Sequence, residues 1–227
     1  MKEDRCSIIL GPPLSGKGTC AGKISEKLGY AHISTGDMFR KMAEDNHPLG
    51  VEAKEKYWGH GDYVPDEMTT ELVFARLERS DCKNGWILDG YPRTIKQANS
   101  LEKEYPTDLV FYLNISLETA VKRAACRRIC SNDKCNFPYN LKTAPPKKEG
   151  LCDKCDSKLY QRKDDSDPSI IKHRLEVYKE KTLPVVELYK KRQLECTIEG
   201  FYEIDANLTS EEVLDSVKRY LRKEDFK

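Results

Sequence analysis

Short runs rich in apolar residues alternate with amphipathic stretches along most of the chain. The apolar runs occupy residues 6–10, 31–34, 85–90, 109–115 and 201–204. Runs of this length are typical of strands that are covered on both faces of a parallel sheet. The stretches between them repeat apolar residues every three or four positions, which predicts helices. We therefore expect an α/β fold in which helices flank a parallel β-sheet.

Polar residues and prolines set the boundaries of several predicted helices. Ser34 or Thr35 can cap a helical stretch that reaches about residue 58 and is interrupted at residues 46–48 by a proline. Asp66 is expected to open the next helix. Residues 209–212 have the spacing of a capping box, which predicts the start of a final helix.

Residues 11–19, Gly-Pro-Pro-Leu-Ser-Gly-Lys-Gly-Thr, join the first predicted strand to the first predicted helix. The spacing G-x-x-x-x-G-K is that of a phosphate-binding loop, in which small residues let backbone N–H groups converge on a phosphate. Lys17 would add positive charge at the β- and γ-phosphates, and Thr19 can reach Mg²⁺. A tight turn without a ligand is the alternative, but the strand–loop–helix context favours a P-loop NTPase.

Two further sites fit a nucleotide-binding enzyme. Asp89 ends the strand predicted at residues 85–90, where an acidic residue on the Mg²⁺ side is expected. An Asp at a strand end is also common in turns, so this interpretation depends on the phosphate loop. Arg93 and Gln97 lie one helical turn apart and can face one ligand.

Length and charge narrow the class of protein. The 227 residues suffice for one sizeable domain, and 39 basic against 38 acidic side chains leave a net charge of +1. This balance argues against a nucleic-acid-binding surface. No apolar run reaches membrane-spanning length, and the charged residues 1–5 leave no room for a signal peptide. We expect a cytoplasmic protein, with a mitochondrial address still open.

Four of the nine cysteines form a pattern of their own. Cys6, Cys20, Cys82, Cys126 and Cys196 are scattered through apparent core or helix positions. Cys130 and Cys135 are followed, after sixteen residues, by Cys152 and Cys155. Two short cysteine pairs at this separation can form a tetrahedral S₄ site, for which Zn²⁺ is favoured and iron, disulfides and free thiols remain alternatives. Four sulfur ligands leave no open position, so the metal is expected to be structural.

Five separated motifs resemble, in order, the adenylate kinase family of nucleoside monophosphate kinases. They are residues 11–19, 34–38, 88–94, 161–165 and 173–175. The resemblance implies a P-loop core made of residues 1–33, 64–125 and 166–227. It further implies a nucleoside-monophosphate-binding arm at residues 34–63 and a lid at residues 126–165 that carries the four-cysteine zinc finger. The terms core, arm and lid are used below for these residues.

The resemblance also implies which residues meet which nucleotide. The donor triphosphate and its Mg²⁺ would bind Leu14, Ser15, Gly16, Lys17, Gly18, Thr19, Asp89, Arg127, Pro138 and Tyr139. AMP would bind Thr35, Arg40, Asp62, Tyr63, Val64, Gly90, Tyr91, Pro92, Arg93, Gln97, Arg162 and Arg174. The catalytic residues would be Lys17, Arg93, Arg127, Arg162 and Arg174, because phosphoryl transfer depends on aligning two polyanions and neutralising the charge on the transferring oxygens.

The expected activity is reversible, Mg²⁺-dependent transfer of the terminal phosphate of ATP to AMP, giving ADP, by a monomer. Tyr139 and Asn140 are similar to the corresponding pair in GTP-using members, so a GTP:AMP phosphotransferase is an alternative. Leu14 stands where the family usually has glycine, so a regulatory nucleotide-binding protein without turnover is a second alternative. A nucleic-acid-binding finger is disfavoured because its acids and bases nearly balance: Asp133, Asp153 and Asp156 against Lys134, Lys154 and Lys158.

Overall fold

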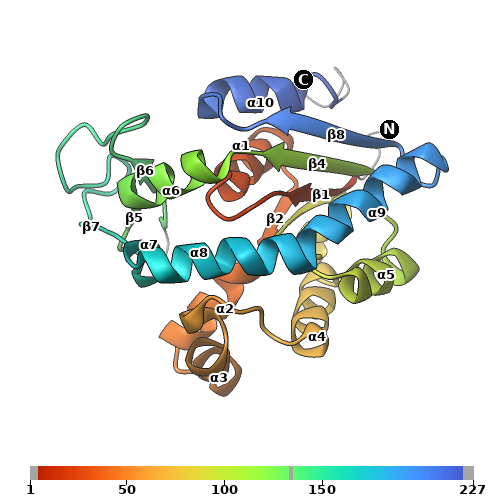
Figure 1. Ribbon diagram of the computed structural model, residues 1–227, viewed down its shortest axis with the longest axis horizontal. Coiled ribbons are helices and arrows are strands. Elements are labelled where there is room, and N and C mark those ends of the chain that lie inside the picture. The colour runs from red at the N-terminus through yellow and green to blue at the C-terminus, as the bar shows by residue number, and fades with distance from the viewer. Residues whose placement is uncertain (1–4, 133–134, 222–227) are drawn as a thin grey trace.

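The computed structural model describes residues 5–132 and 135–221 (Figure 1). Residues 1–4, which belong to the charged start of the chain, lie outside the described residues. So do Asp133 and Lys134, two of the charged residues counted above in the finger.

The main sheet, within the described residues, has five parallel strands in the order β2-β3-β1-β4-β8. Their bounds are β1 Cys6–Leu10, β2 Ala31–Ser34, β3 Trp86–Asp89, β4 Leu109–Asn114 and β8 Gly200–Asp205. The predicted parallel α/β sheet is therefore confirmed. Strand β1 lies between β3 and β4, so the chain leaves β1 and β3 at the same edge of the sheet. In open α/β sheets this edge is where ligands bind.

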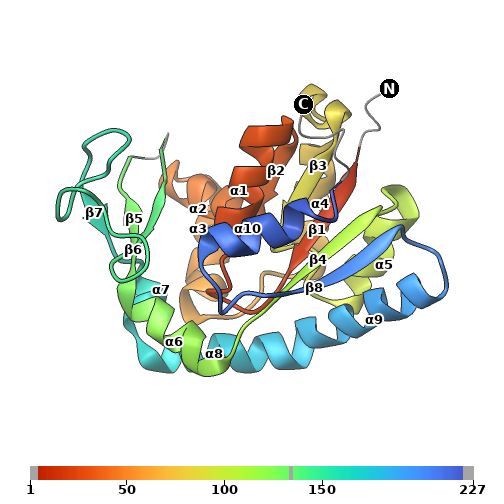
Figure 2. The same cartoon turned by 90° about the horizontal axis from the view of Figure 1, so that it is seen from above.

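Helices cover both faces of the sheet (Figures 1 and 2). Because side chains alternate along a strand, Ile9 and Phe111 point into one core while Ile8 and Val110 point into the other. The first core includes residues of α1 Lys17–Leu28, α6 Leu117–Cys126, α8 Pro168–Val177 and α10 Ser210–Lys218. The second includes residues of α4 Asp66–Leu77, α5 Ile95–Glu104 and α9 Leu183–Leu194.

The predicted helix boundaries are confirmed at three places. Helix α2 Thr35–Glu44 ends before the break and α3 Pro48–Lys56 begins at its proline. Helix α4 begins at Asp66. Helix α10 begins with the expected capping box, in which the backbone N–H of Thr209 donates to Glu212 Oε2 at 2.9 Å and the backbone N–H of Glu212 donates to Thr209 Oγ1 at 3.3 Å.

The arm and the lid each have a small cluster of buried side chains. In the arm, α2 and α3 pack around Phe39, Ala53 and Val64. The described part of the lid contains β5 Arg127–Cys130, β6 Pro138–Asn140 and β7 Leu159–Tyr160, paired antiparallel in the order β6-β5-β7. Figure 2 shows this small sheet projecting to one side of the main sheet. The short helix α7 Lys163–Ser166 leads back to the core.

In the part of the chain that the structure describes, three further turns are helical but not α-helical. They are 3₁₀ turns at Trp58–His60 and Ser80–Asn84 and a π-helical turn at Tyr178–Thr182. The expectation for Cys196 is wrong, since this residue is exposed in the turn after α9 instead of lying in the core or a helix.

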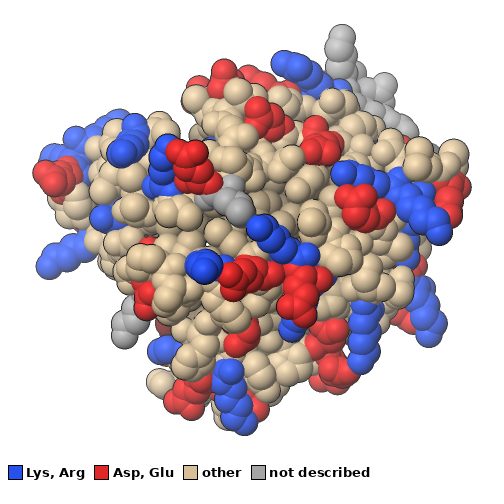
Figure 3. Space-filling model, viewed as in Figure 1, with Lys and Arg blue, Asp and Glu red and all other residues tan. Residues whose placement is uncertain are grey.

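The surface gives no sign of one dominant charge on the face that Figure 3 shows, where basic and acidic side chains are intermixed. Among the helices of the described residues, none combines the length and the apolar character needed to cross a bilayer.

Candidate active site

A cavity of about 860 Å³ opens where the core, arm and lid meet. Its size is in the range of pockets that bind small molecules. Nearly all of the predicted nucleotide-binding residues line it: Leu14, Ser15, Gly16, Lys17, Gly18, Thr19, Thr35, Arg40, Asp62, Tyr63, Val64, Asp89, Gly90, Pro92, Arg93, Gln97, Arg127, Pro138, Tyr139, Arg162 and Arg174. Tyr91 is placed behind this wall, with its side chain fully buried and its hydroxyl 3.1 Å from that of Thr70.

The loop between β1 and α1 curves through three residues with positive φ: Gly11 at 147°, Leu14 at 69° and Gly16 at 93°. At Gly11 a side chain could not fit, because a Cβ would lie 2.5 Å from the carbonyl oxygen of Leu113. Leu14 has a left-handed conformation that suits glycine better than leucine. The loop thus keeps a strong curvature that turns it toward the start of α1, although a leucine occupies its middle.

Lys17 is the first residue of α1, and its Nζ donates to the carbonyl oxygens of Gly11 and Pro12, each at 2.8 Å. Burial lowers its pKa to about 8, and Asp89 opposes this change while nearby arginines add to it. The arginines are Arg93, Arg174 and Arg127. Gathering these cations in one partly buried space is unfavourable by itself, so the site favours a multiply charged anion.

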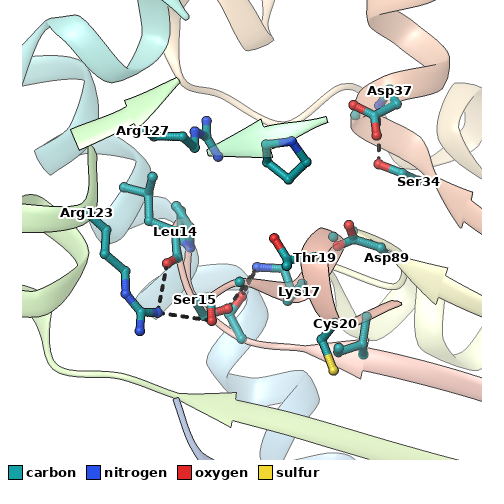
Figure 4. A pocket seen from close by; sticks show the side chains of 18 of the residues that line it. Leu14, Ser15, Lys17, Thr19, Cys20, Ser34, Asp37, Asp89, Arg123 and Arg127 are labelled. Atoms are coloured by element: carbon teal, nitrogen blue, oxygen red, sulfur yellow. Dashed lines mark hydrogen bonds between the residues drawn. The ribbon is translucent and has the colours of Figure 1, made fainter. Parts of the chain in front are cut away.

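Arg123 was not predicted, yet Figure 4 shows its guanidinium group bonded to the phosphate loop at Leu14 and Ser15. Its guanidinium donates to the carbonyl oxygens of Leu14 and Ser15 at 3.4 and 3.3 Å. It also donates to those of Ala206 and Leu208 at 2.6 and 3.2 Å, after strand β8. No spacing in the sequence signals this role, because the carbonyl groups that Arg123 binds are remote from it in sequence.

Asp89 lies beside the phosphate loop, and Figure 4 shows it near Thr19. A Cβ added to Gly18 would lie 3.1 Å from Asp89 Oδ2, so the carboxylate is packed against the start of α1. His32 Nε2 is 3.7 Å from the same oxygen. A carboxylate and a threonine hydroxyl next to a phosphate site are oxygen donors of the kind that Mg²⁺ prefers, so these residues fit the ion.

On the opposite wall, Arg93 is held by several neighbours. Its Nε donates to the carbonyl oxygen of Gly90 at 2.8 Å, and its backbone N–H donates to Gln97 Oε1 at 2.7 Å. Thr35 Oγ1 also donates to the carbonyl of Gly90, at 2.9 Å. The side-chain amide nitrogen of Gln97, Nε2, donates to Asp66 Oδ1 at 2.8 Å. Gln97 therefore contributes to the wall mainly by fixing the backbone of Arg93.

Two carboxylates at the end of the lid hold two of the predicted arginines together. Arg127 Nε donates to Asp165 Oδ2 at 2.6 Å, and Arg174 Nη1 lies 3.2 Å from Asp165 Oδ1. Arg174 Nη1 is also 2.8 Å from Asp164 Oδ2. Because the Asp165 side chain is fully buried, its charge is well placed to fix both guanidinium groups.

A third carboxylate, Asp37, connects the arm with the end of the lid. Its Oδ1 lies 2.6 Å from Arg40 Nη2 and 3.3 Å from Arg162 Nη2. Burial acts against its ionisation, but the guanidinium groups of Arg40 and Arg162 and a hydrogen bond with Ser34 outweigh burial and lower its pKa to about 2. The two predicted arginines are thus drawn toward each other across the cavity mouth.

The four cysteines of the lid come together as the spacing predicted. Their Sγ atoms all lie within 4.8 Å of one another, with Cys130 and Cys155 3.4 Å apart and Cys135 and Cys152 3.6 Å apart. A tetrahedral site with metal–sulfur bonds of about 2.3 Å has sulfur–sulfur edges of about 3.8 Å. The four-residue gap between Cys130 and Cys135 therefore does not prevent a tetrahedral metal site.

The surroundings of these sulfur atoms also suit a metal. The backbone N–H groups of Asn132 and Lys154 donate to the Sγ atoms of Cys130 and Cys152, both at 3.4 Å. Such bonds support thiolate ligands. The hydroxyl of Tyr139 accepts from the backbone N–H of Asp153 at 2.7 Å and lies 3.4 Å from Cys152 Sγ. Tyr139, which lines the cavity, thus connects the cluster to the cavity wall.

Comparisons with known proteins agree with this arrangement. The sequence model of a family described as "Adenylate kinase" matches residues 9–194. A protein named "Adenylate kinase" from Clostridium tetani is 46% identical over 201 residues, which cover 86% of this chain and 91% of the relative. Proteins of the same name from Thermosipho africanus and Clostridium novyi are 44% and 45% identical, covering 93% and 87% of this chain and 99% and 92% of the relatives.

Proposed function

The chain belongs to the adenylate kinase family, and we propose how this enzyme, an ATP:AMP phosphotransferase, divides its cavity between two nucleotides. In the reaction an oxygen of the AMP phosphate attacks the γ-phosphorus of ATP. The bond from that phosphorus to the bridging oxygen breaks, and two molecules of ADP result. The observation that carries the assignment is the convergence of Lys17, Arg93, Arg127 and Arg174 on one cavity.

The donor half is formed by the phosphate loop, Lys17, Arg123 and Arg127. Backbone N–H groups at the start of α1 are suited to the β-phosphate, and Lys17 to the β- and γ-phosphates. Arg123 keeps the loop in its curve through the carbonyls of Leu14 and Ser15. Asp89 and Thr19 would hold Mg²⁺, which when bound neutralises charge on the phosphate oxygens. Pro138 and Tyr139 would cover the donor from the lid.

The acceptor half is formed by the arm and the residues after β3. Arg40 and Arg93 are suited to the AMP phosphate, while Thr35 and residues 62–64 lie where its nucleoside would fit. Arg162 and Arg174 would meet phosphates of both nucleotides. Guanidinium groups bind phosphate oxygens in pairs, which fixes the line between the attacking oxygen and the phosphorus.

We further propose that the lid metal is Zn²⁺, held by Cys130, Cys135, Cys152 and Cys155. Four cysteine sulfur atoms that all lie within 4.8 Å of one another favour it, and it would supply rigidity without taking part in the reaction. The division into a core, an arm at 34–63 and a lid at 126–165 is supported by a separate buried cluster in the lid and by a cluster in which Phe39 and Ala53 of the arm pack with Val64 at the border of the core.

A single chain furnishes every wall of the cavity, which supports a monomer as the working unit. No disulfide bond joins any of the nine cysteines in the described residues, which supports a reducing compartment such as the cytoplasm.

The GTP alternative depended on the resemblance of Tyr139 and Asn140 to the pair in GTP-using members, and the alternative without turnover depended on Leu14. Asn140 suggested GTP as donor, but its Oδ1 accepts from the backbone N–H groups of Lys142 and Thr143 at 3.0 and 3.1 Å and so closes a turn. Leu14 suggested a protein without turnover, but its backbone adopts the left-handed conformation that glycine would adopt. These contacts leave ATP:AMP phosphotransfer as the favoured function.

A donor competition tests the proposal. ATP and GTP are offered together with AMP and Mg²⁺, and the products are separated by chromatography. We expect ATP to be consumed with little GDP formed, at a turnover near the roughly 1–100 per second of related kinases. GDP formed at a rate equal to or above the loss of ATP would establish the GTP alternative, and turnover below about one per minute would favour the regulatory protein.

A further inference from the structure

The long helix that crosses the molecule in Figure 1 as α8 and α9 contains a π-helical turn, Tyr178–Thr182. The backbone N–H of Leu183 bonds to the carbonyl of Tyr178, five residues earlier. Pro184 explains the irregularity, because it lacks an N–H and its ring crowds the carbonyl four residues before it. Such turns are rare and occur often at functional sites, since they change the direction in which side chains point.

The turn directs Thr182 toward the acceptor half of the cavity. Thr182 is 4% exposed and lines the cavity wall. Its Oγ1 donates to the backbone carbonyl of Arg93 at 3.0 Å and lies 2.8 Å from the hydroxyl oxygen of Tyr63. A hydroxyl has one hydrogen to donate. Because Thr182 gives its hydrogen to Arg93, Tyr63 must donate to Thr182, so the three residues form one directed chain of hydrogen bonds.

Tyr63 also contacts the side chain of Arg93. The guanidinium carbon of Arg93 lies 4.8 Å from the centre of the Tyr63 ring, which is a cation–π arrangement. The Nε of Arg93 is bonded to the carbonyl of Gly90, which leaves the two terminal nitrogens as its donors for a phosphate. A Cβ at Gly90 would lie 2.8 Å from one of these nitrogens, so the guanidinium is closely fitted on this side as well.

We propose that Thr182 and Tyr63 are positioning residues for Arg93, an inference that rests on the proposed function. Thr182 fixes the backbone of Arg93 and the hydroxyl of Tyr63, and the Tyr63 ring fixes the plane of the guanidinium. Together they keep the terminal nitrogens of Arg93 aimed at the acceptor phosphate. Since Tyr63 belongs to the arm and Thr182 to the core, the chain of hydrogen bonds also couples the position of the arm to Arg93.

The test uses substitutions that remove a hydroxyl and little else. Thr182→Val and Tyr63→Phe are expected to lower kcat/KM for AMP about tenfold each, because a buried carbonyl or hydroxyl loses its partner. The KM for ATP should change less than about twofold. The double variant should be close to the worse single variant, since both changes break one chain of bonds. Tyr63→Leu, which also removes the ring, should be more severe than Tyr63→Phe.

Thr182→Ser keeps the hydroxyl and is expected to recover most of the activity lost in Thr182→Val. The positioning role would be overturned if kcat/KM fell equally for ATP and for AMP. It would also be overturned if Thr182→Ser, at unchanged thermal stability, did not recover kcat/KM for AMP. The unmodified chain is assayed in parallel. Absence of AMP-dependent turnover in that chain would contradict the proposed function itself, so the two failures are distinguishable.

Discussion

The core and the lid of this chain are stabilised by different interactions. In the core, side chains such as Ile8, Leu88 and Val110 are completely buried between sheet and helices. Each buried side chain of this kind contributes about 1.5–3 kcal/mol. In the described part of the lid, the buried cluster consists of Cys130, Tyr139 and Cys152, with a few partly buried neighbours. So few apolar contacts cannot offset the entropy lost when the lid becomes ordered.

This difference indicates a division of tasks. Burial gives the core a fixed sheet edge on which the phosphate loop and Asp89 can be placed. A metal held by the four cysteines, as proposed above, would give the lid rigidity that does not depend on packing against the core. The contacts that Asp164 and Asp165 of the lid make with Arg174 of the core are ionic. Such contacts suit a lid that closes over nucleotides and excludes water, because they can form and break without exposing apolar surface.

The largest effect on activity is expected from Lys17→Met. This substitution removes a charge from the phosphate loop of the core, and it affects neither the buried apolar core nor the four-cysteine cluster of the lid. Removing a preorganised charge from a phosphate site should lower kcat about a hundredfold to a thousandfold. Thermal unfolding and the metal content of the lid should not change. Steady-state kinetics and calorimetry measure these quantities. Lys27→Met, on an exposed position of the same helix, is the matched control. Similar losses of kcat in Lys17→Met and Lys27→Met would contradict the role of Lys17.

The second largest effect on activity is expected from Cys155→Ser, which removes one of the four metal-binding side chains of the lid. We expect loss of bound zinc, faster proteolysis within residues 126–165 and a roughly tenfold or larger loss of activity. The main unfolding transition of the core should stay in place. Zinc analysis, limited proteolysis and calorimetry test this. Cys196→Ser is the control, since Cys196 is an exposed free thiol. A Cys155→Ser chain that retains one zinc per molecule would contradict the assignment.

The features that sequence predicted well are those encoded locally. The phosphate loop follows from the spacing of residues 11–19 between a strand and a helix, and the metal cluster follows from two short cysteine pairs. The parallel sheet follows from short apolar runs separated by helical periodicity. In each case, residues that lie close together in sequence carry the signal.

The features that sequence did not predict depend on residues far apart in the chain. Arg123 bonds to carbonyls after β1 and after β8, and its partners become neighbours only when the sheet forms. Thr182 reaches Arg93 because of a π-helical turn that no periodicity reveals. Tyr91 belongs to a nucleotide-binding motif, yet its ring is part of the core. Motifs thus predicted residues that line one cavity, while the tertiary contacts of each side chain could not be predicted from them.

A smaller effect is expected from Leu14→Gly, which tests whether apolar burial also stabilises the phosphate loop. The left-handed conformation costs leucine about 1–2 kcal/mol. Its side chain is 8% exposed and packs in the core, which returns about 1.5–3 kcal/mol. Glycine would relieve the strain, lose this burial and add about 0.5–1 kcal/mol of unfolded-state entropy. We therefore expect the variant to be about 1–2 kcal/mol less stable in denaturant unfolding.

Leu14→Ala sharpens this prediction, because it keeps the strained Cβ and loses most of the burial. It should be less stable than Leu14→Gly. If Leu14→Gly were more stable than the unmodified chain, the loop would be held by its backbone alone and the burial of Leu14 would be irrelevant.

The smallest effect is expected on the stability that comes from the ionic contact between Asp37 of the arm and Arg162 at the end of the lid. The folded-state pKa of Asp37 is about 2, below its ordinary value of 3.8. A lowered pKa means that the folded chain favours the ionised carboxylate. The stabilisation is therefore complete above about pH 4 and is lost as the pH falls toward 2. Since 41% of the side chain is exposed, water screens the contact and the contribution should be below about 1 kcal/mol.

Asp37→Asn tests this contribution with little change in shape. The free energy of unfolding is measured in urea at pH 5 and pH 3 for the unmodified chain and the variant, and the two differences are compared. Protonation of the lid cysteines affects both chains alike, so it cancels in the comparison. We expect the variant to lose less stability than the unmodified chain on acidification. Equal losses of unfolding free energy in the two chains would mean that the charge of Asp37 does not stabilise the contact with Arg40 and Arg162. The arm and the lid would then be held together only by the nucleotides that bind between them.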